Sequence, residues 1–260
     1  MTPLAQWLVS EVLHFALVSA RAAGVVIVAP LAWSGSPVRI RVALVLVLSM
    51  VGFSLAPAGT TIPEPVFAAL ALATEFAVGV AMGFVVRLAV AAVEIAGEVM
   101  APAIGLGAAQ VFDPGADAQQ NALAKLLRYL VILLALSVGL HRVLVGSLLA
   151  SYRVLPAGIA EAPAPVLATL LRLSAEAFEV GVRLSLPVLA VLFMTQIALA
   201  FIARAAPTMQ IFNLGFGVML VVGGLMMVLL LPDMARAMLA DLSHVGTRIE
   251  ALLLEMGARP

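Results

Sequence analysis

Residues 105–121 read GLGAAQVFDPGADAQQN, a glycine-bearing apolar run that ends at Phe112 and breaks into a polar turn at Asp113, Pro114 and Gly115. Proline fixes its own backbone, and aspartate and glycine tolerate tight turns, so this tripeptide favours a break in any helix that reaches it. The break lies near the middle of a chain that is otherwise strongly apolar. It is either an ordinary inter-helix loop or a non-helical element that lines a passage. The first alternative predicts a passive helical bundle, and the second predicts a gate.

The chain around this break has the composition of an integral membrane protein. Of its 260 residues, 64% are hydrophobic and 11% are charged, whereas soluble domains average about 45–50% apolar and about 25% charged residues. The 14 basic and 14 acidic residues balance, and no basic patch favours nucleic acid. The absence of cysteine excludes disulfides, thiol nucleophiles and cysteine-bound metals.

Long apolar runs predict an all-α membrane fold, because a helix needs about 20 apolar residues to cross a bilayer. The runs that are long enough cover residues 7–33, 66–93, 126–150, 180–203 and 211–231. Residues 42–56 form a shorter run that could begin earlier in the chain. Residues 99–112 are too few to span alone, and we expect either a continuation of the preceding helix or a re-entrant piece.

Residues 234–256 follow a different pattern, in which apolar residues recur at helical spacing and charged residues fall between them. The apolar positions are Met234, Met238, Leu242, Val245, Ile249, Leu252 and Met256. Such a stripe predicts an amphipathic helix that needs a partner surface.

Ionisable residues also lie within or beside the apolar runs, where charge is costly and usually faces protein or water. They form stripes at helical spacing, which are Glu11, His14 and Arg21; Arg87, Glu94 and Glu98; and Arg172, Glu176, Glu179 and Arg183. Glu75 stands alone in its run. The stripes could form an ion path, but each one mixes signs, which favours pairing between helices or subunits. Glu179 and Arg183 have the favourable i,i+4 order. Many such stripes predict many protein neighbours and hence a subunit of an assembly.

Small residues predict close helix packing. Gly79 and Gly83 form a G-x-x-x-G motif, a spacing that allows two helix backbones to approach each other. Gly215, Gly217 and Gly223 indicate similar packing later in the chain.

Motifs of known catalytic chemistry are missing from the sequence. It has no phosphate-binding G-x-x-x-x-G-K-[ST], no H-E-x-x-H, no G-x-S-x-G and no G-x-G-x-x-G. We therefore predict no catalytic residue, no metal ligand and no cofactor, and we expect a protein that is not an enzyme.

Three motifs occur in a distinctive order along the chain. The first is Arg21 and Ala29-Pro30 followed by Ser34-Gly-Ser-Pro-Val-Arg39-Ile-Arg41, and the second is Gly105-Leu-Gly107-Ala-Ala-Gln-Val-Phe112-Asp113-Pro114. The third is Ala206-Pro207-x-x-Gln210-Ile211-Phe212-Asn213-x-Gly215-Phe216. This ordered set resembles the FliR/SctT family of type III secretion export-gate subunits. The last motif looks more like the flagellar form, FliR, than the injectisome form, SctT.

The resemblance implies a fold of bent helical hairpins in the bacterial inner membrane, at the flagellar basal body. Residues 1–170 would be similar to FliP and would include a central plug loop at about 106–121. Residues 171–260 would be similar to a FliQ-type hairpin with an amphipathic tail. The implied plug residues are Leu106, Gly107, Val111, Phe112, Asp113, Pro114 and Gly115, and the implied cytoplasmic turn contains Arg204, Pro207, Gln210 and Phe212.

The resemblance also implies partners and a task. FliP, FliQ and FlhB would contact the chain, FlhA would lie nearby, and membrane lipid would surround the assembly. The cargo would be unfolded flagellar proteins, which leave through a channel that this subunit helps to form and plug. Inter-helix or inter-subunit contacts would involve Arg87, Glu94, Glu98, Glu176, Glu179 and Arg183.

A secondary transporter of a small solute is the alternative from another class. Broken helices near the bilayer midplane are typical of those folds, and the interrupted stretch 99–115 could be half of a binding site. The sequence shows no matching broken element in a second half. The partner-seeking tail also favours a subunit over a transporter that works alone.

Overall fold

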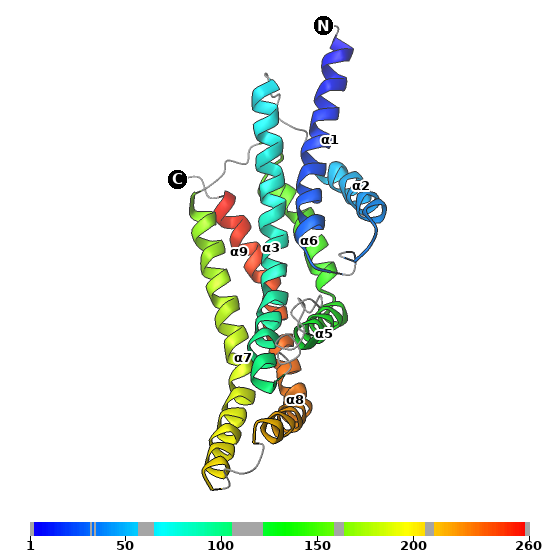
Figure 1. The fold of residues 1–260 in the computed structure, drawn as a ribbon. Coiled ribbons are helices and arrows are strands. Elements are labelled where there is room, and N and C mark those ends of the chain that lie inside the picture. Colours follow the sequence, from blue (N-terminus) through cyan, green and yellow to red (C-terminus); the bar gives the residue numbers. More distant parts are fainter. Residues whose placement is uncertain are drawn as a thin grey trace. The chain divides into compact units, whose positions relative to one another are not determined.

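The computed structural model describes residues 3–31, 33, 35–56, 65–105, 122–158, 164–205 and 211–257. Within these ranges the chain forms helices and no strands, so the predicted all-α fold is confirmed (Figure 1). The helices are α1 (Pro3–Val28), α2 (Val38–Leu55), α3 (Pro65–Ile104), α5 (Ala122–Val138), α6 (Leu140–Val154), α7 (Ala164–Ala205), α8 (Ile211–Ser243) and α9 (Val245–Gly257).

Helix lengths confirm the predicted membrane protein. Among the described residues, 5 helical stretches are long and apolar enough to cross a bilayer, and the number rises to 6 if α5 and α6 together form one span. α2 qualifies because it begins at Val38, directly after Pro37 and four residues earlier than the apolar run predicted. α3 has 40 residues and runs through Glu94 and Glu98, so the run 66–93 continues into residues 99–104, the described part of the predicted run 99–112.

The predicted run 126–150 is wrong as a single helix, because the chain bends by 65° between α5 and α6. Gly139 lies at the break with a φ of +80°, a left-handed conformation that glycine adopts without strain. A lone glycine inside an apolar run does not by itself indicate a break, since helices tolerate single glycines.

The described chain divides into two compact units. Unit 1 comprises Met1–Ala89, Ala135–Ser174 and Leu242–Pro260, and unit 2 comprises Val90–Leu134 and Ala175–Asp241. In unit 1, α2 packs on α1 and α6, and α9 packs on α6. The predicted boundary between residues 170 and 171 concerns likeness to other proteins, and it stays a prediction.

Glycines set the contact between α1 and α3 in unit 1, which is a close helix contact of the kind that the G-x-x-x-G motif predicts. A Cβ atom built on Gly24 of α1 would lie 2.5 Å from the carbonyl oxygen of Phe76 and 2.7 Å from the amide nitrogen of Val80. A Cβ atom on Gly79 would overlap the carbonyl oxygen of Arg21, and one on Gly83 would also meet the backbone of α1. The two backbones therefore touch with no room for a side chain between them.

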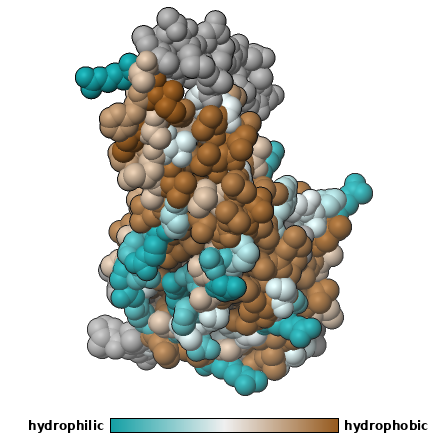
Figure 2. Space-filling model, turned by 90° about the horizontal axis from the view of Figure 1, so that it is seen from below, coloured by the Kyte–Doolittle hydropathy of each residue, from teal (hydrophilic) through white to brown (hydrophobic). Residues whose placement is uncertain are grey.

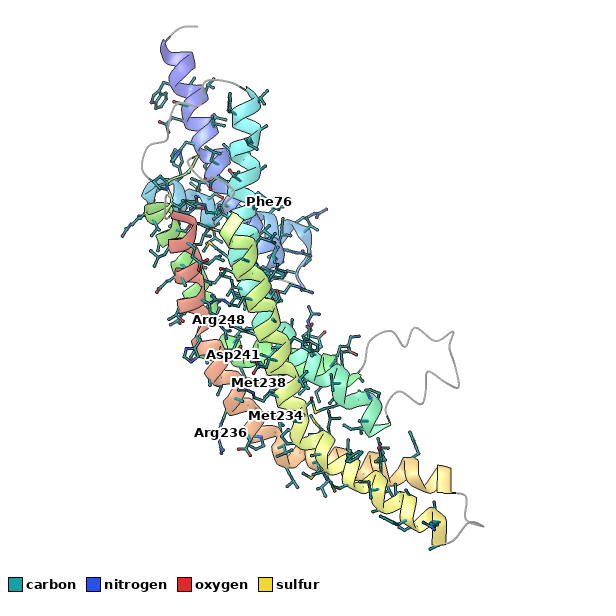
Figure 3. All side chains as sticks on the ribbon, turned by 90° about the vertical axis from the view of Figure 1, so that its left-hand side faces the viewer. Phe76, Met234, Arg236, Met238, Asp241 and Arg248 are labelled. Atoms are coloured by element: carbon teal, nitrogen blue, oxygen red, sulfur yellow. The ribbon has the colours of Figure 1, made fainter. Side chains whose placement is uncertain are left out.

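In unit 2, α5, α7 and α8 all pack against the C-terminal part of α3. A Cβ atom on Gly97 would lie 2.6 Å from the α-carbon of Ala124 in α5, and one on Gly223 of α8 would lie 2.7 Å from Ile104. Gly181 of α7 lies equally close to α3. The parts of α7 and α8 that belong to unit 2 lie side by side (Figures 1 and 3), and α8 changes direction near Met234, two residues after Pro232. Proline frees a backbone carbonyl and bends a helix there.

The apolar stripe of residues 234–256 is covered by the chain itself. Met234, Met238, Leu242, Val245, Ile249 and Leu252 are all buried, with exposed fractions of 4% or less. Figure 3 marks Met234 and Met238 along α8, with the exposed Arg236 between them in sequence. The predicted need for a partner surface is therefore met for these positions within this chain, in part by the packing of α9 on α6.

Candidate functional site: the flanks of the central segment and a buried arginine

The predicted plug residues Leu106, Gly107, Val111, Phe112, Asp113, Pro114 and Gly115 lie outside the described residues. Both helices that flank this segment are described, and both flanks belong to unit 2. α3 ends at Ile104, α5 begins at Ala122, and the contact of Gly97 with Ala124 joins the two helices. The first turn of α5 thus lies beside α3.

The C-terminal end of α3, which precedes the central segment, is in contact with α8. Gly105 has a φ of +97°, and a Cβ atom built on it would lie 3.0 Å from the ring of Phe216. Phe216 belongs to the third sequence motif and Gly105 opens the second, so the structure places these two residues in contact within unit 2. The sequence order alone does not indicate this contact.

The predicted turn residues lie at the end of α7 and the start of α8. Arg204 is exposed in the last turn of α7, and Phe212 is in the first turn of α8. Pro207 and Gln210 lie outside the described residues.

The charged stripes form ion pairs of the kind the sequence favours. Arg128 Nε of α5 lies 3.2 Å from Glu94 Oε1 of α3, so Glu94 pairs across two helices. Glu179 and Arg183 form the expected i,i+4 pair within α7 at 2.5 Å. Arg87 and Glu98 are exposed on α3, and Glu176 is half-buried on α7. A role for these groups in contacts between subunits stays a prediction.

A buried ion pair in unit 1 joins two residues that the sequence analysis did not pair with each other. Arg21 of α1 and Glu75 of α3 both have fully buried side chains, and Arg21 Nη2 lies 2.6 Å from Glu75 Oε2. Arg21 Nε also donates to Glu75 Oε2 at 2.7 Å. The sequence did carry a signal, because Arg21 lies three residues before Gly24 and Glu75 lies four residues before Gly79. Each charge therefore lies on the face that its glycine marks for contact.

The remaining donors of Arg21 reach the end of α6. Nη1 donates to Ser151 Oγ at 3.0 Å, and Nη2 donates to the carbonyl oxygen of Leu155 at 2.9 Å. The guanidinium carbon lies 4.7 Å from the ring centre of Tyr152, a cation–π distance. Each nitrogen of the Arg21 guanidinium thus has an acceptor. This set of contacts fastens α1, α3 and α6 to one another.

Apolar side chains remain exposed along almost the whole of α7. They are Leu167, Leu171, Phe178, Leu186, Phe193, Met194, Ile197, Phe201 and Ile202. Figure 2 shows hydrophobic residues over much of the viewed face, with hydrophilic ones between them. The first and last of these positions are 35 residues apart, which corresponds to about 53 Å of helix. The hydrocarbon core of a bilayer is about 30 Å thick, so α7 is longer than a straight, untilted span needs.

No group of three or more potential metal ligands occurs within the described ranges. An open groove in unit 2 has a volume of about 410 Å³. Its lining is apolar except for Gln196, and it includes Ala103, Leu186 and Phe193. This groove offers no charged group to a solute or a cofactor.

Comparison with known proteins places these features in a family. The family model described as "Bacterial export proteins, family 1" matches residues 12–245. The chain is similar to the Flagellar biosynthetic protein FliR of Escherichia coli strain K12, with 31% identity over 202 residues and 76% of each chain covered. It is also similar to the protein of the same name from Pectobacterium carotovorum, with 30% identity over 75% of this chain and 74% of that one. The match to the Caulobacter vibrioides protein of that name has 26% identity and covers 85% and 89%.

Proposed function

Because this chain belongs to the bacterial export proteins of family 1, we propose that it is a non-enzymatic subunit of the flagellar protein-export apparatus. The family resemblance drawn from the three sequence motifs is confirmed by the match over residues 12–245. The similar proteins are named flagellar biosynthetic proteins, and the chain has helices able to span the inner membrane. Its location is accordingly the inner membrane at the flagellar basal body.

The observation that carries this proposal is the long exposed apolar surface of α7. A 42-residue helix with large apolar side chains exposed over about 53 Å exceeds the hydrocarbon thickness by about 20 Å. A straight helix of this length that is tilted by about 40° still has a rise of about 40 Å, although Pro187 lies inside α7 and proline can bend a helix. An apolar surface of this length favours protein neighbours, as a subunit of a larger assembly has and a solitary transporter lacks.

The partners that this proposal assigns are FliP, FliQ and FlhB, with FlhA nearby. In the proposal, residues 171–260 are the FliQ-like part, and the hairpin of α7 and α8 supplies the shape that this likeness requires. Residues 1–170 are the FliP-like part. The turn between α7 and α8, with Arg204, Pro207, Gln210 and Phe212, faces the cytoplasm and the neighbouring subunits.

The proposed task is to help form and close a channel for unfolded flagellar proteins. The segment 106–121 is the plug, and its small and apolar residues, Leu106, Gly107, Val111 and Phe112 among them, seal the channel against ions. Asp113, Pro114 and Gly115 turn the chain at its tip. The flanks support this assignment, because α3, which precedes the segment, and α5, which follows it, are in contact. The plug would move aside when cargo arrives, so its mechanism is steric.

Co-expression tests the assembly. A tagged copy of this chain, produced with FliP and FliQ and purified in mild detergent, should give a complex with a single copy of this chain in native mass spectrometry. A stable, solute-binding particle made of this chain alone would overturn the proposal and favour the transporter. Assembly with injectisome partners in preference to flagellar ones would instead assign the chain to the SctT form.

Ion leakage tests the plug. Deletion of residues 112–118 in the assembled complex should raise the ion conductance of reconstituted membranes, while the complex keeps its composition. The matched control is a replacement of residues 116–121 by Gly and Ser at equal length, which keeps Val111 and Phe112. Unchanged conductance after the deletion, in a complex of normal composition, would refute the plug assignment without touching the assignment to the export apparatus.

A further inference from the structure

Backbone groups at the buried end of α6 need hydrogen-bond partners, and Arg21 and Glu75 supply them together. α6 ends at Val154, and the chain continues through Leu155 and Ala157, which are 5% and 2% exposed. The last carbonyl groups of a helix have no partners within the helix, and amides beyond its cap residue must also find partners elsewhere. When such groups are buried away from water, each unpaired one costs several kcal/mol.

At this helix end, the arginine of the buried ion pair binds a backbone carbonyl and the glutamate binds a backbone amide. Arg21 Nη2 donates to the carbonyl oxygen of Leu155 at 2.9 Å, and Glu75 Oε1 accepts from the amide of Gly158 at 2.9 Å. The other carboxylate oxygen, Oε2, is the one that binds Arg21. Ser151 adds a relay, because its hydroxyl donates to the carbonyl of Leu148 at 2.7 Å and accepts from Arg21 Nη1 at 3.0 Å.

We propose that Arg21 and Glu75 form a directional cap on the end of α6. In this cap the cation binds the carbonyl end of the helix and the carboxylate binds the amide that follows it. The direction matters because an arginine has only donors and an ionised glutamate has only acceptors. The arrangement also agrees with the helix dipole, whose negative end attracts a cation. The pair thereby positions residues 155–158, the described part of the α6–α7 junction, in addition to neutralising itself.

Two roles for the pair make different predictions. If the pair only neutralises buried charge, interchange of the two residues keeps one cation and one anion in contact and preserves the junction. If the pair is a directional cap, interchange places donors opposite the amide of Gly158 and acceptors opposite the carbonyl of Leu155. Both backbone groups then lose their partners, and the junction opens.

The cysteine-free sequence allows a clean reporter of this opening. A single Ala157→Cys substitution places a thiol at the buried junction, and a second reporter variant carries Ala101→Cys in unit 2, where the alanine is 3% exposed. Both are expressed with their partner subunits, and maleimide labelling is measured in membranes. Arg21→Glu with Glu75→Arg should speed labelling at position 157 at least tenfold and leave labelling at position 101 unchanged. The matched control interchanges Glu179 and Arg183, which are 66% and 73% exposed, and it should leave both rates unchanged.

If the interchanged variant does not accumulate in cells, a comparison of two Glu75 variants tests the cap instead. Glu75→Gln keeps an oxygen acceptor for the amide of Gly158, whereas Glu75→Met has nearly the same length and offers only a weakly accepting sulfur. Both remove the charge, so neutralisation alone predicts equal labelling at position 157. The cap predicts labelling at least threefold slower in the glutamine variant. Equal rates in this pair, or continued protection of position 157 in the interchanged variant, would overturn the proposal.

Discussion

Replacement of Gly24 by alanine should destabilise unit 1, because the new methyl group has no space between α1 and α3. Its Cβ atom would lie 2.5 Å from the carbonyl oxygen of Phe76 and 2.7 Å from the amide nitrogen of Val80. Ordinary carbon–oxygen contacts are about 3.3–3.6 Å, so the backbones must separate by about 1 Å. Both obstacles are backbone atoms, which cannot rotate aside as a flexible side chain does.

The expected size of the effect follows from two opposing contributions. Overpacking of a close contact costs about 1–3 kcal/mol, and a backbone clash lies at the upper end of that range. Alanine recovers up to about 1 kcal/mol in a helix because it loses less conformational freedom than glycine. The net loss is about 2 kcal/mol, which lowers the Tm of a protein of this size by about 4–8 °C.

Thermal unfolding of the purified complex in detergent measures this effect. Gly146→Ala in α6 is the matched control, since no atom of the described chain lies within 4 Å of a Cβ at that position. It should leave the Tm unchanged or raise it slightly. Gly24→Ala combined with Gly79→Ala should cost less than the sum of the single changes, because both act on one interface. A Gly24→Ala variant as stable as Gly146→Ala would refute the backbone contact.

Further substitutions have smaller expected effects, all measurable by the same unfolding experiment. Gly139→Ala should cost about 1–2 kcal/mol, because a φ of +80° strains any residue with a Cβ atom. Thr169→Val should cost about 1.5 kcal/mol, because it removes the 2.6 Å hydrogen bond from the Thr169 hydroxyl to the carboxylate of Glu255. Arg183→Ala should change stability by at most about 0.5 kcal/mol, since its pair with Glu179 is exposed to solvent or lipid headgroups.

Local sequence patterns predicted the features of this fold that depend on one helix face. Apolar run length indicated the helices, and Gly79 with Gly83 indicated that their helix packs closely on another one, without specifying which. Mixed charge signs indicated pairing, and Glu179 pairs with Arg183 as the i,i+4 rule predicts. α3 continues past the predicted end of its first run because charged residues at helical spacing do not stop a helix when one face can carry them.

Contacts between segments that lie far apart in the sequence could not be predicted from local patterns. Arg21 meets Glu75, which is 54 residues away, and sequence spacing gives no choice among possible partners for a buried charge. The amphipathic stripe from Met234 onward indicated that some surface covers it. An apolar stripe does not specify whether that surface belongs to a partner or to the same chain. The central segment 106–121 was assigned by resemblance, and its role remains a prediction that the leakage experiment tests.

The packing of α9 on α6 also fixes an order of events during synthesis. α9 begins at Val245, 91 residues after α6 ends at Val154. At about 5–20 residues per second, translation reaches α9 roughly 5–18 seconds after α6 is complete. During this interval α7 and α8 are already made, while α6 still lacks the helix that later covers one of its faces. Unit 1 therefore closes last although its first helix is made first, and an insertion that lengthens the chain between α6 and α9 should prolong the time during which a chaperone or a protease can reach that face.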